Sequence, residues 1–344
     1  MNTSAIETTG VAAARHITSA DKFKSLLKRE FWENKGGFFW APIVAGGISL
    51  FLSLLGAIAS IFMVGKAKSS IDGDFKEVEI HLQSAEALQA LGFAGDMSLL
   101  GGVALALVVM TFVVFFYSLG ALYDERKDRS VLFWKSLPVS DTQTVLSKLT
   151  WALLLAPLLA VGFGLLIGIG QWILGALAMV LSGLPGASAM FTESHPFRML
   201  GNALTVIPVY AAWSLPTVGW LMFCSAWARS KPFLWAVLVP VMAGAVISWL
   251  DMLPGIDNLP HEYVWYTLLV RGLLSIIPMT WYANKTVFES HDVSNLHGPE
   301  DLMRMVDFSS SWNAFLTVDL WVGVIVGVAF IAAAIRLRRW RDEG

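Results

Sequence analysis

The chain has 344 residues, of which 56% are hydrophobic and only 15% are charged. A soluble domain carries about 25% charged residues, so this composition argues against a water-soluble enzyme. The 24 basic and 26 acidic residues give no basic surface for nucleic acid, and the single cysteine excludes a disulfide framework or a cysteine-based metal site.

Charged residues occur in clusters separated by long apolar runs, which is typical of a polytopic helical membrane protein. A membrane-spanning helix needs about 20 apolar residues. We therefore expect an all-α polytopic membrane protein in which residues 1–344 form a single transmembrane domain. The six predicted spans lie near 41–64, 98–123, 149–181, 203–228, 233–250 and 316–336.

Lys and Arg are distributed unevenly between alternate connecting segments, which predicts the orientation. Segments 1–40, 124–148, 229–232 and 336–344 contain 17 of these residues, whereas the longer alternate segments 66–97, 183–204 and 251–318 contain 7. The positive-inside rule places both termini in the cytoplasm. Residues 1–40 lack the apolar region of a cleavable signal peptide, so the first span is expected to act as the insertion signal.

The segment before the first span, residues 21–34, predicts an amphipathic helix that lies in the inner-leaflet interface. Thr18 and Asp21 have the spacing of a capping box that begins this helix. Basic side chains line one side of the helix. The apolar stripe on the other side consists of Phe23, Leu26, Leu27 and Phe31.

The following segment, residues 66–97, is acidic and polar, and predicts an external loop with a short helix at 85–91. The five clearest spans contain no ionisable residue in their interiors, although ion-coupled transporters usually place one at mid-membrane. In the third span, Gln171 and the pair Gly164 and Gly168 indicate helix–helix packing. The absence of ionisable residues from these span interiors favours a transporter that takes its energy from another protein.

Between the second and third spans, a charged cluster at 124–129 is followed by an apolar aromatic patch that contains Phe133 and Trp134. Pro138 disfavours helix at the residue before it. Ser140 and Gln143 then form a capping box that begins the third span. We expect a short separate helix at about 125–135 on the cytoplasmic surface, with its aromatic side chains exposed to a partner protein.

The external segment 251–318 contains three histidines without metal-ligand spacing, so a metal site is not expected there. Its apolar part, residues 263–284, could instead form a seventh span. A seventh span would place Arg271 at mid-membrane, at a cost of about 2.5–3.5 kcal/mol. We prefer a re-entrant or interfacial hairpin that is broken at Pro278, with Arg271 reaching the headgroups.

The loop between the second and third spans resembles that of the membrane subunits (permeases) of type-2 ABC exporters. These permeases commonly carry Glu-Arg, a Gly-Thr three residues after that Arg, Pro eight residues past the Thr, and Gly-Lys opening the third span. The matching positions are Glu125, Arg126, Pro138, Val139, Ser140 and Lys148, with Ser130 in the Thr position. Arg129 and Ser147 replace the usual glycines. The six spans, the amphipathic helix and the external hairpin also resemble this family.

The resemblance implies that the loop is a coupling helix that docks on a separate ATPase subunit, and that the permease works beside a second permease copy or paralogue. The chain carries no Gly-x-x-x-x-Gly-Lys-Ser/Thr loop, so ATP and magnesium would bind the partner ATPase. The expected location is the bacterial inner membrane, in contact with membrane lipid. The docking residues implied are Glu125, Arg126, Lys127, Asp128, Phe133, Trp134, Lys135, Leu137 and Pro138.

Two other classes of function are open. An intramembrane enzyme acting on lipids would use the segment 251–318, but neither Gly-x-Ser-x-Gly nor His-Glu-x-x-His occurs. A scaffold or sensor would dock a cytoplasmic partner through the same loop without ATP. For an exporter, charge-free spans favour amphipathic or lipid-like molecules, peptides or drugs over ions.

Overall fold

The computed structural model describes residues 18–70, 74–129, 139–251, 261–284, 287 and 308–340. Within these ranges all regular structure is helical. Among the described residues, six helical segments are long and apolar enough to cross a membrane, which confirms the predicted number. They are Gly36–Ser70, Ala85–Lys127, Asp141–Leu181, Pro196–Trp227, Pro232–Asp251 and Val318–Trp340.

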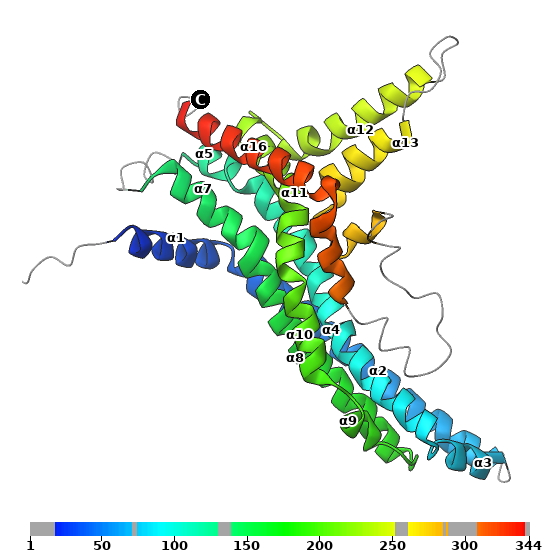
Figure 1. Cartoon of the computed structure of the whole chain (residues 1–344). Coiled ribbons are helices and arrows are strands. Elements are labelled where there is room, and N and C mark those ends of the chain that lie inside the picture. The colour runs from blue at the N-terminus through cyan, green and yellow to red at the C-terminus, as the bar shows by residue number, and fades with distance from the viewer. Residues whose placement is uncertain are drawn as a thin grey trace, which may run out of the picture.

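The six segments form two groups, and the second segment, Ala85–Lys127, contacts both. One group contains α2, α4 and α8, which run together in Figure 1, and the other contains α11, α12, η3 and α16. The bounds are α2 Ala41–Ser70, α4 Ala85–Gly120, α8 Ala156–Leu181, α11 Ile207–Trp227, α12 Pro232–Asp251, η3 Tyr266–Leu274 and α16 Val318–Trp340.

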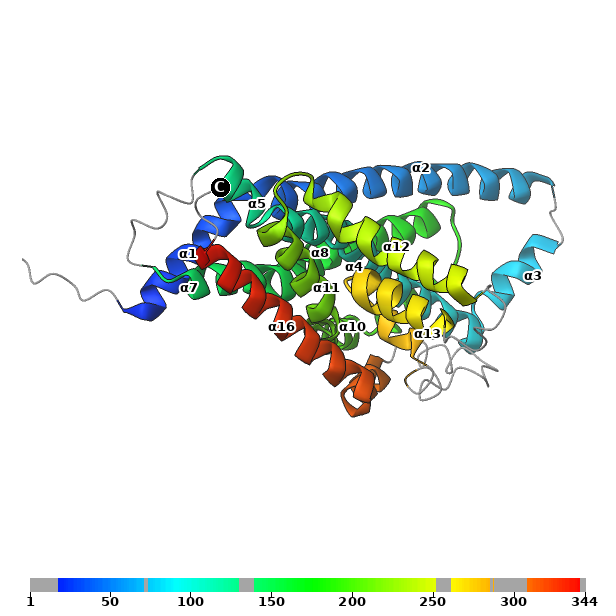
Figure 2. The same cartoon turned by 90° about the horizontal axis from the view of Figure 1, so that it is seen from above.

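The two ends of the molecule differ in their short elements. The proximal end, as we call it, holds α1 and the end of α16, which lie on the same side in Figures 1 and 2. The distal end holds α3 and α9. The remaining elements are α1 Ser19–Glu33, η1 Gly36–Trp40, α3 Asp74–His81, α5 Tyr123–Lys127, α7 Asp141–Thr150, η2 Trp151–Leu155, α9 Ala189–Thr192, α10 Pro196–Thr205, α13 His261–Trp265, η4 Thr280–Ala283 and η5 Phe308–Leu316.

Glycines bring the central helices into close contact. A Cβ atom added to Gly102 of α4 would collide with the backbone of Gly164 and Gly168 on α8, which confirms that this predicted pair marks close packing. A Cβ atom added to Gly219 of α11 would likewise collide with the backbone of Gly327 on α16. Gln171 donates a 2.8 Å hydrogen bond to Ser49 and joins α8 to α2.

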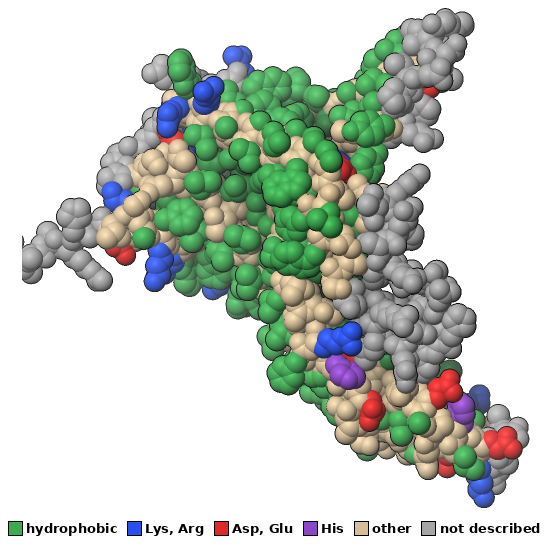
Figure 3. Space-filling model, in the orientation of Figure 1, with side chains coloured by type: hydrophobic (Ala, Val, Ile, Leu, Met, Phe, Trp, Pro, Cys, Tyr) green, Lys and Arg blue, Asp and Glu red, His purple; other side chains and the backbone are tan. Residues whose placement is uncertain are grey.

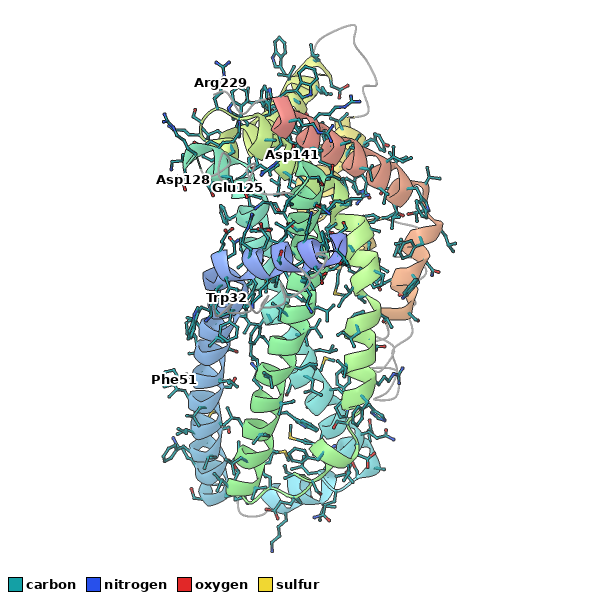
Figure 4. All side chains as sticks on the ribbon, turned by 90° about the vertical axis from the view of Figure 1, so that its left-hand side faces the viewer. Trp32, Phe51, Glu125, Asp128, Asp141 and Arg229 are labelled. Carbon is teal, nitrogen blue, oxygen red and sulfur yellow. The ribbon has the colours of Figure 1, made fainter. Side chains whose placement is uncertain are left out.

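The outer surface of the spans is apolar. Figure 3 shows hydrophobic side chains over the middle of the molecule, with most of the visible charged side chains towards its ends. Phe51 of α2 points away from the bundle in Figure 4 and is 59% exposed. Such a large exposed apolar surface suits contact with a bilayer.

Several helices are longer than predicted because polar turns at their ends stay helical beyond the apolar core. The short helix expected at 85–91 is the first part of α4, which Ser84 caps. The third segment begins at Asp141, after the predicted capping box of Ser140 and Gln143. It then continues through η2 into α8.

The segment 263–284 differs from the prediction in the position of Arg271. The side chain is 5% exposed and, rather than reaching outwards, it lies over the Trp213 ring at 3.7 Å. Its Nε donates to Asp319 Oδ1 at 3.1 Å. The helical run ends at Leu274, and Met279 has a φ of 68° directly after Pro278, so the backbone turns where the break was predicted.

Helix α1 begins at the predicted capping box of Thr18 and Asp21. Its apolar stripe differs from the prediction because the chain itself covers it. Leu26 is buried, Phe31 stacks on Trp151 at 5.6 Å, and the Trp151 indole donates to the carbonyl of Leu27 at 2.7 Å. The stripe therefore holds α1 against the third span, and α1 is part of the bundle.

Candidate functional site

Buried charged side chains join five helices at the proximal end. We call this group the ion-pair network. Three cations and three carboxylates form the group and their formal charges cancel, while the more exposed Glu33 pairs with Arg29 at its edge. The members are Arg29 and Glu30 of α1, Glu125 of α5, Asp141 and Lys148 of α7, and Arg338 of α16, with the hydroxyl of Tyr117 from α4.

Lys148 lies at the centre of the network. Its Nζ is 2.9 Å from Glu30 Oε1 and 3.1 Å from Glu125 Oε1. The three side chains are nearly inaccessible to solvent, so each charge depends on the others for compensation. Lys148 therefore ties α1 and α5 to the start of the third span.

Arg338 connects the same carboxylate to the last span. Its Nη1 donates to Glu125 Oε2 at 2.5 Å, and its Nε donates to Asp141 Oδ1 at 3.1 Å. A cation in the last turn of α16 also interacts favourably with the helix dipole. The α16 end is thereby fixed to both α5 and α7.

Arg29 completes the network on the α1 side. Its Nη2 is 2.6 Å from Glu30 Oε1 and 3.0 Å from Glu125 Oε1. Burial by itself would lower the pKa of Arg29, but Glu30, Glu33 and Glu125 together raise that pKa above its usual value. Burial raises the pKa of Glu33, against the opposing effect of Arg29. Tyr117 donates a 2.8 Å hydrogen bond to Glu30 Oε2.

Arg126, the neighbour of Glu125, binds a different part of the bundle. Its Nη2 donates to the carbonyls of Ser225 and Ala228 at the end of α11, at 2.6 and 2.9 Å. The hydroxyl of Ser225 accepts from the backbone N–H groups of Leu122 and Tyr123. The turn between α4 and α5 is therefore fixed on α11.

The predicted docking residues fall into three groups. Glu125 and Arg126 form the contacts described above, inside the chain. Lys127 and Asp128 are exposed, and Figure 4 shows Asp128 at the edge of the molecule. Of the predicted helix at 125–135, the structure describes only the first residues: α5 ends at Lys127, Arg129 has a φ of 56°, and residues 130–135 lie outside the described residues. Phe133, Trp134, Lys135, Leu137 and Pro138 lie outside the described residues.

Two grooves lie on the exposed side of α4 next to the network. One has a volume of about 860 Å³ and extends from the end of α1 to Phe112, and the other, of about 530 Å³, extends to Phe233 of α12. They share Phe116, Gly120 and Asp124. This side of α4 is therefore hollow, apolar within the span and acidic at the proximal end.

The sequence contains only partial signals for the network. Glu30 lies three and four residues after Leu27 and Leu26, so it is an acidic residue on an apolar stripe. Lys148 stands directly before a long run without charges. Neither signal identifies a partner. In the described part of the chain, the network included, no group of three or more His, Cys, Asp or Glu side chains could hold a metal ion.

Comparison with known proteins finds no match to this chain. No family model, no curated protein and no solved structure matches it.

Proposed function

We propose that this chain is the permease subunit of an ABC exporter, driven by a separate ATPase and paired with a second permease. The observation that carries the proposal is the anchoring of the loop after α4. Its first turn is bonded to α1, α7 and α16 through Glu125, and to α11 through Arg126. A loop anchored in this way can pass a displacement to most of the bundle.

The energetics of the network support transmission as a rigid unit. Removing one partner of a buried ion pair costs about 3–5 kcal/mol, because the other charge is left without compensation. A push on the loop would therefore move α5 together with the helices bonded to it, since separating them costs more. In the proposal, ATP binding closes the ATPase pair and supplies that push.

The proximal end is the cytoplasmic end in this proposal. The positive-inside rule favours this orientation, because α1, the loop after α4 and the end of α16 carry most of the Lys and Arg residues. An ATPase without spans of its own would then reach the exposed Lys127 and Asp128. The membrane would be the bacterial inner membrane.

The hollow side of α4 is the surface that best suits the second permease and the cargo. Phe112 and Phe116 are 63% and 59% exposed beside the two grooves. Aromatic side chains of this kind are enriched at protein interfaces. Cargo moving between two such faces would meet apolar walls within the span and acidic side chains at the proximal end, which suits amphipathic molecules.

The test uses the chain purified together with its ATPase in lipid nanodiscs. The ATPase would be the product of a neighbouring reading frame with a Walker-A loop. Trp134→Asp is expected to abolish stimulation of ATP hydrolysis by the permease and to leave its insertion unchanged. Trp340→Asp is the matched control, because Trp340 is 85% exposed at the same end and is not one of the predicted docking residues.

Equal hydrolysis in the two variants would overturn the assignment of the loop as the docking element. Failure of the chain to copurify with any nucleotide-hydrolysing protein would overturn the exporter assignment itself. A partner without a Walker-A loop would instead support a scaffold or sensor.

A further inference from the structure

A pocket separate from the network lies among α11, α12, η3 and α16. Its volume is about 280 Å³, just below the usual range of about 300–1,000 Å³ for small-molecule pockets. Apolar side chains form its walls, among them Trp220, Val239 and Phe330, and Arg271 and Asp319 lie at one end. None of the ion-pair network lines this pocket.

Two prolines account for the shape of the walls. Pro240 has no N–H, so the carbonyl of Ala236 lacks its helical donor, and the Trp220 indole supplies one at 2.9 Å. Pro216 lies opposite on α11, and Arg271 donates to the Trp213 carbonyl one turn before it. Both prolines line the pocket.

The polar end of the pocket is already neutralised. Arg271 Nε pairs with Asp319 Oδ1, and the Tyr266 hydroxyl donates to Asp319 Oδ2 at 2.6 Å. A Cβ atom at Gly323 would collide with the Arg271 guanidinium, so this glycine gives the pair its room. An ion would gain little here, because the cation and the carboxylate already compensate each other. The pocket therefore favours an apolar occupant.

The mouth of the pocket lies on the membrane-facing surface. Val239 is 41% exposed, and Val322 and Val326 of α16 are 52% and 41% exposed. Along α16, the lining extends from Asp319 to Phe330, which is about 16 Å at the helical rise per residue. One leaflet of a bilayer is about 15 Å deep in hydrocarbon. The pocket thus has the length of one lipid tail and opens where lipid tails lie.

We propose that this pocket holds one acyl chain of a membrane phospholipid from the distal leaflet, inserted between α12 and the rest of its helix group. Helix α12 buries little of its own surface in the chain, so the inserted tail completes its packing. The headgroup lies beside the Arg271–Asp319 end. This site requires only that the six helices span a bilayer, and it is independent of the proposed ATPase.

The experiment maps contacts of a photoactivatable lipid. The full-length protein is reconstituted in phosphatidylethanolamine and phosphatidylglycerol membranes that contain a phospholipid with a diazirine on one acyl chain. After irradiation, labelled residues are identified by peptide mass spectrometry. The expected sites are Trp220, Val326 and Phe330.

Ala243→Phe is designed to fill the pocket, which Ala243 lines, and Ala245→Phe makes the same change at an exposed position two residues along α12. Labelling inside the pocket should fall about tenfold in Ala243→Phe, equivalent to about 1.4 kcal/mol, and stay unchanged in Ala245→Phe. If Ala243→Phe fails to fold, Val326→Trp fills the pocket from α16. Its control is Val328→Trp, at an exposed position outside the pocket.

Equal labelling of the pocket in the filled and control variants would overturn the proposal. So would labelling of the unchanged protein that is confined to outward-facing residues such as Leu238. Each result stands whether or not an ATPase partner is found.

Discussion

The most direct perturbation of the ion-pair network is Lys148→Met, which removes its central cation and retains the length of an unbranched side chain. Lys148 is 3–4% exposed and lies within 3.1 Å of two carboxylates, Glu30 and Glu125. Without it, both carboxylates stay buried with less compensation. Lys127→Met makes the same change on an exposed residue of α5 and is the matched control.

The expected cost is near the lower end of the range for a broken buried pair. Removing one partner of such a pair costs about 3–5 kcal/mol. Glu30 keeps Arg29 and the Tyr117 hydroxyl, and Glu125 keeps Arg338 at 2.5 Å. We therefore expect Lys148→Met to lower the free energy of unfolding by about 3 kcal/mol. Lys127→Met should change it by less than about 0.5 kcal/mol.

The free energy of unfolding can be measured by titrating the protein in mixed micelles with sodium dodecyl sulfate and following its circular dichroism. The double variant Glu30→Gln/Lys148→Met should recover about 1–2 kcal/mol of the loss, because it neutralises one of the two carboxylates that lose their contact with Lys148. Equal losses in Lys148→Met and Lys127→Met would refute the reasoning, since the network would then contribute no more than surface charges do.

Three further variants test other contacts by the same titration. Tyr117→Phe removes the hydrogen bond to Glu30 and should lower the free energy of unfolding by about 2 kcal/mol, as expected for a bond to a charged group. An unchanged free energy of unfolding would mean that the hydroxyl does not reach Glu30. Gly102→Ala should lower the free energy of unfolding by about 1–3 kcal/mol, because its new Cβ meets the backbone of α8. Gly101→Ala has room for the Cβ and should not lower it. Similar values for the two variants would contradict the close packing. Arg271→Met leaves Asp319 without its cation and should cost about 3 kcal/mol, and a loss below about 0.5 kcal/mol would place Arg271 in contact with solvent or headgroups.

The number of spans and the starts of two helices could be predicted from the sequence because these features depend on neighbouring residues. Charge-free runs identified the six apolar segments. Both capping boxes, at Thr18 and at Ser140, are formed as predicted. The ends of the spans could not be predicted by hydropathy alone, because the helices continue through Glu86 and Gln89 of residues 85–91 and through the polar residues 141–148.

The contents of the site could not be predicted, since its contacts join residues far apart in the chain. Lys148 and Glu30 are 118 residues apart, and Arg338 and Glu125 are 213 residues apart. The amphipathic pattern of α1 is the same whether its apolar stripe meets lipid or protein, so the packing on Trp151 was not foreseen. Arg271 is a similar case, because its compensation by Asp319 depends on the arrangement of η3 and α16.

The positions of Glu125 and Arg126 change the role that the resemblance implies for them. Consecutive residues on a helix point about 100° apart, so one turn can hold two neighbours at once. Glu125 contacts α1, α7 and α16, whereas Arg126 contacts the end of α11. Under the proposed function, these two residues anchor the loop to the permease, and docking on the ATPase falls to the exposed Lys127 and Asp128 and to the residues after them. A substitution at Glu125 should then lower both stability and coupling, whereas one at Asp128 should lower coupling alone.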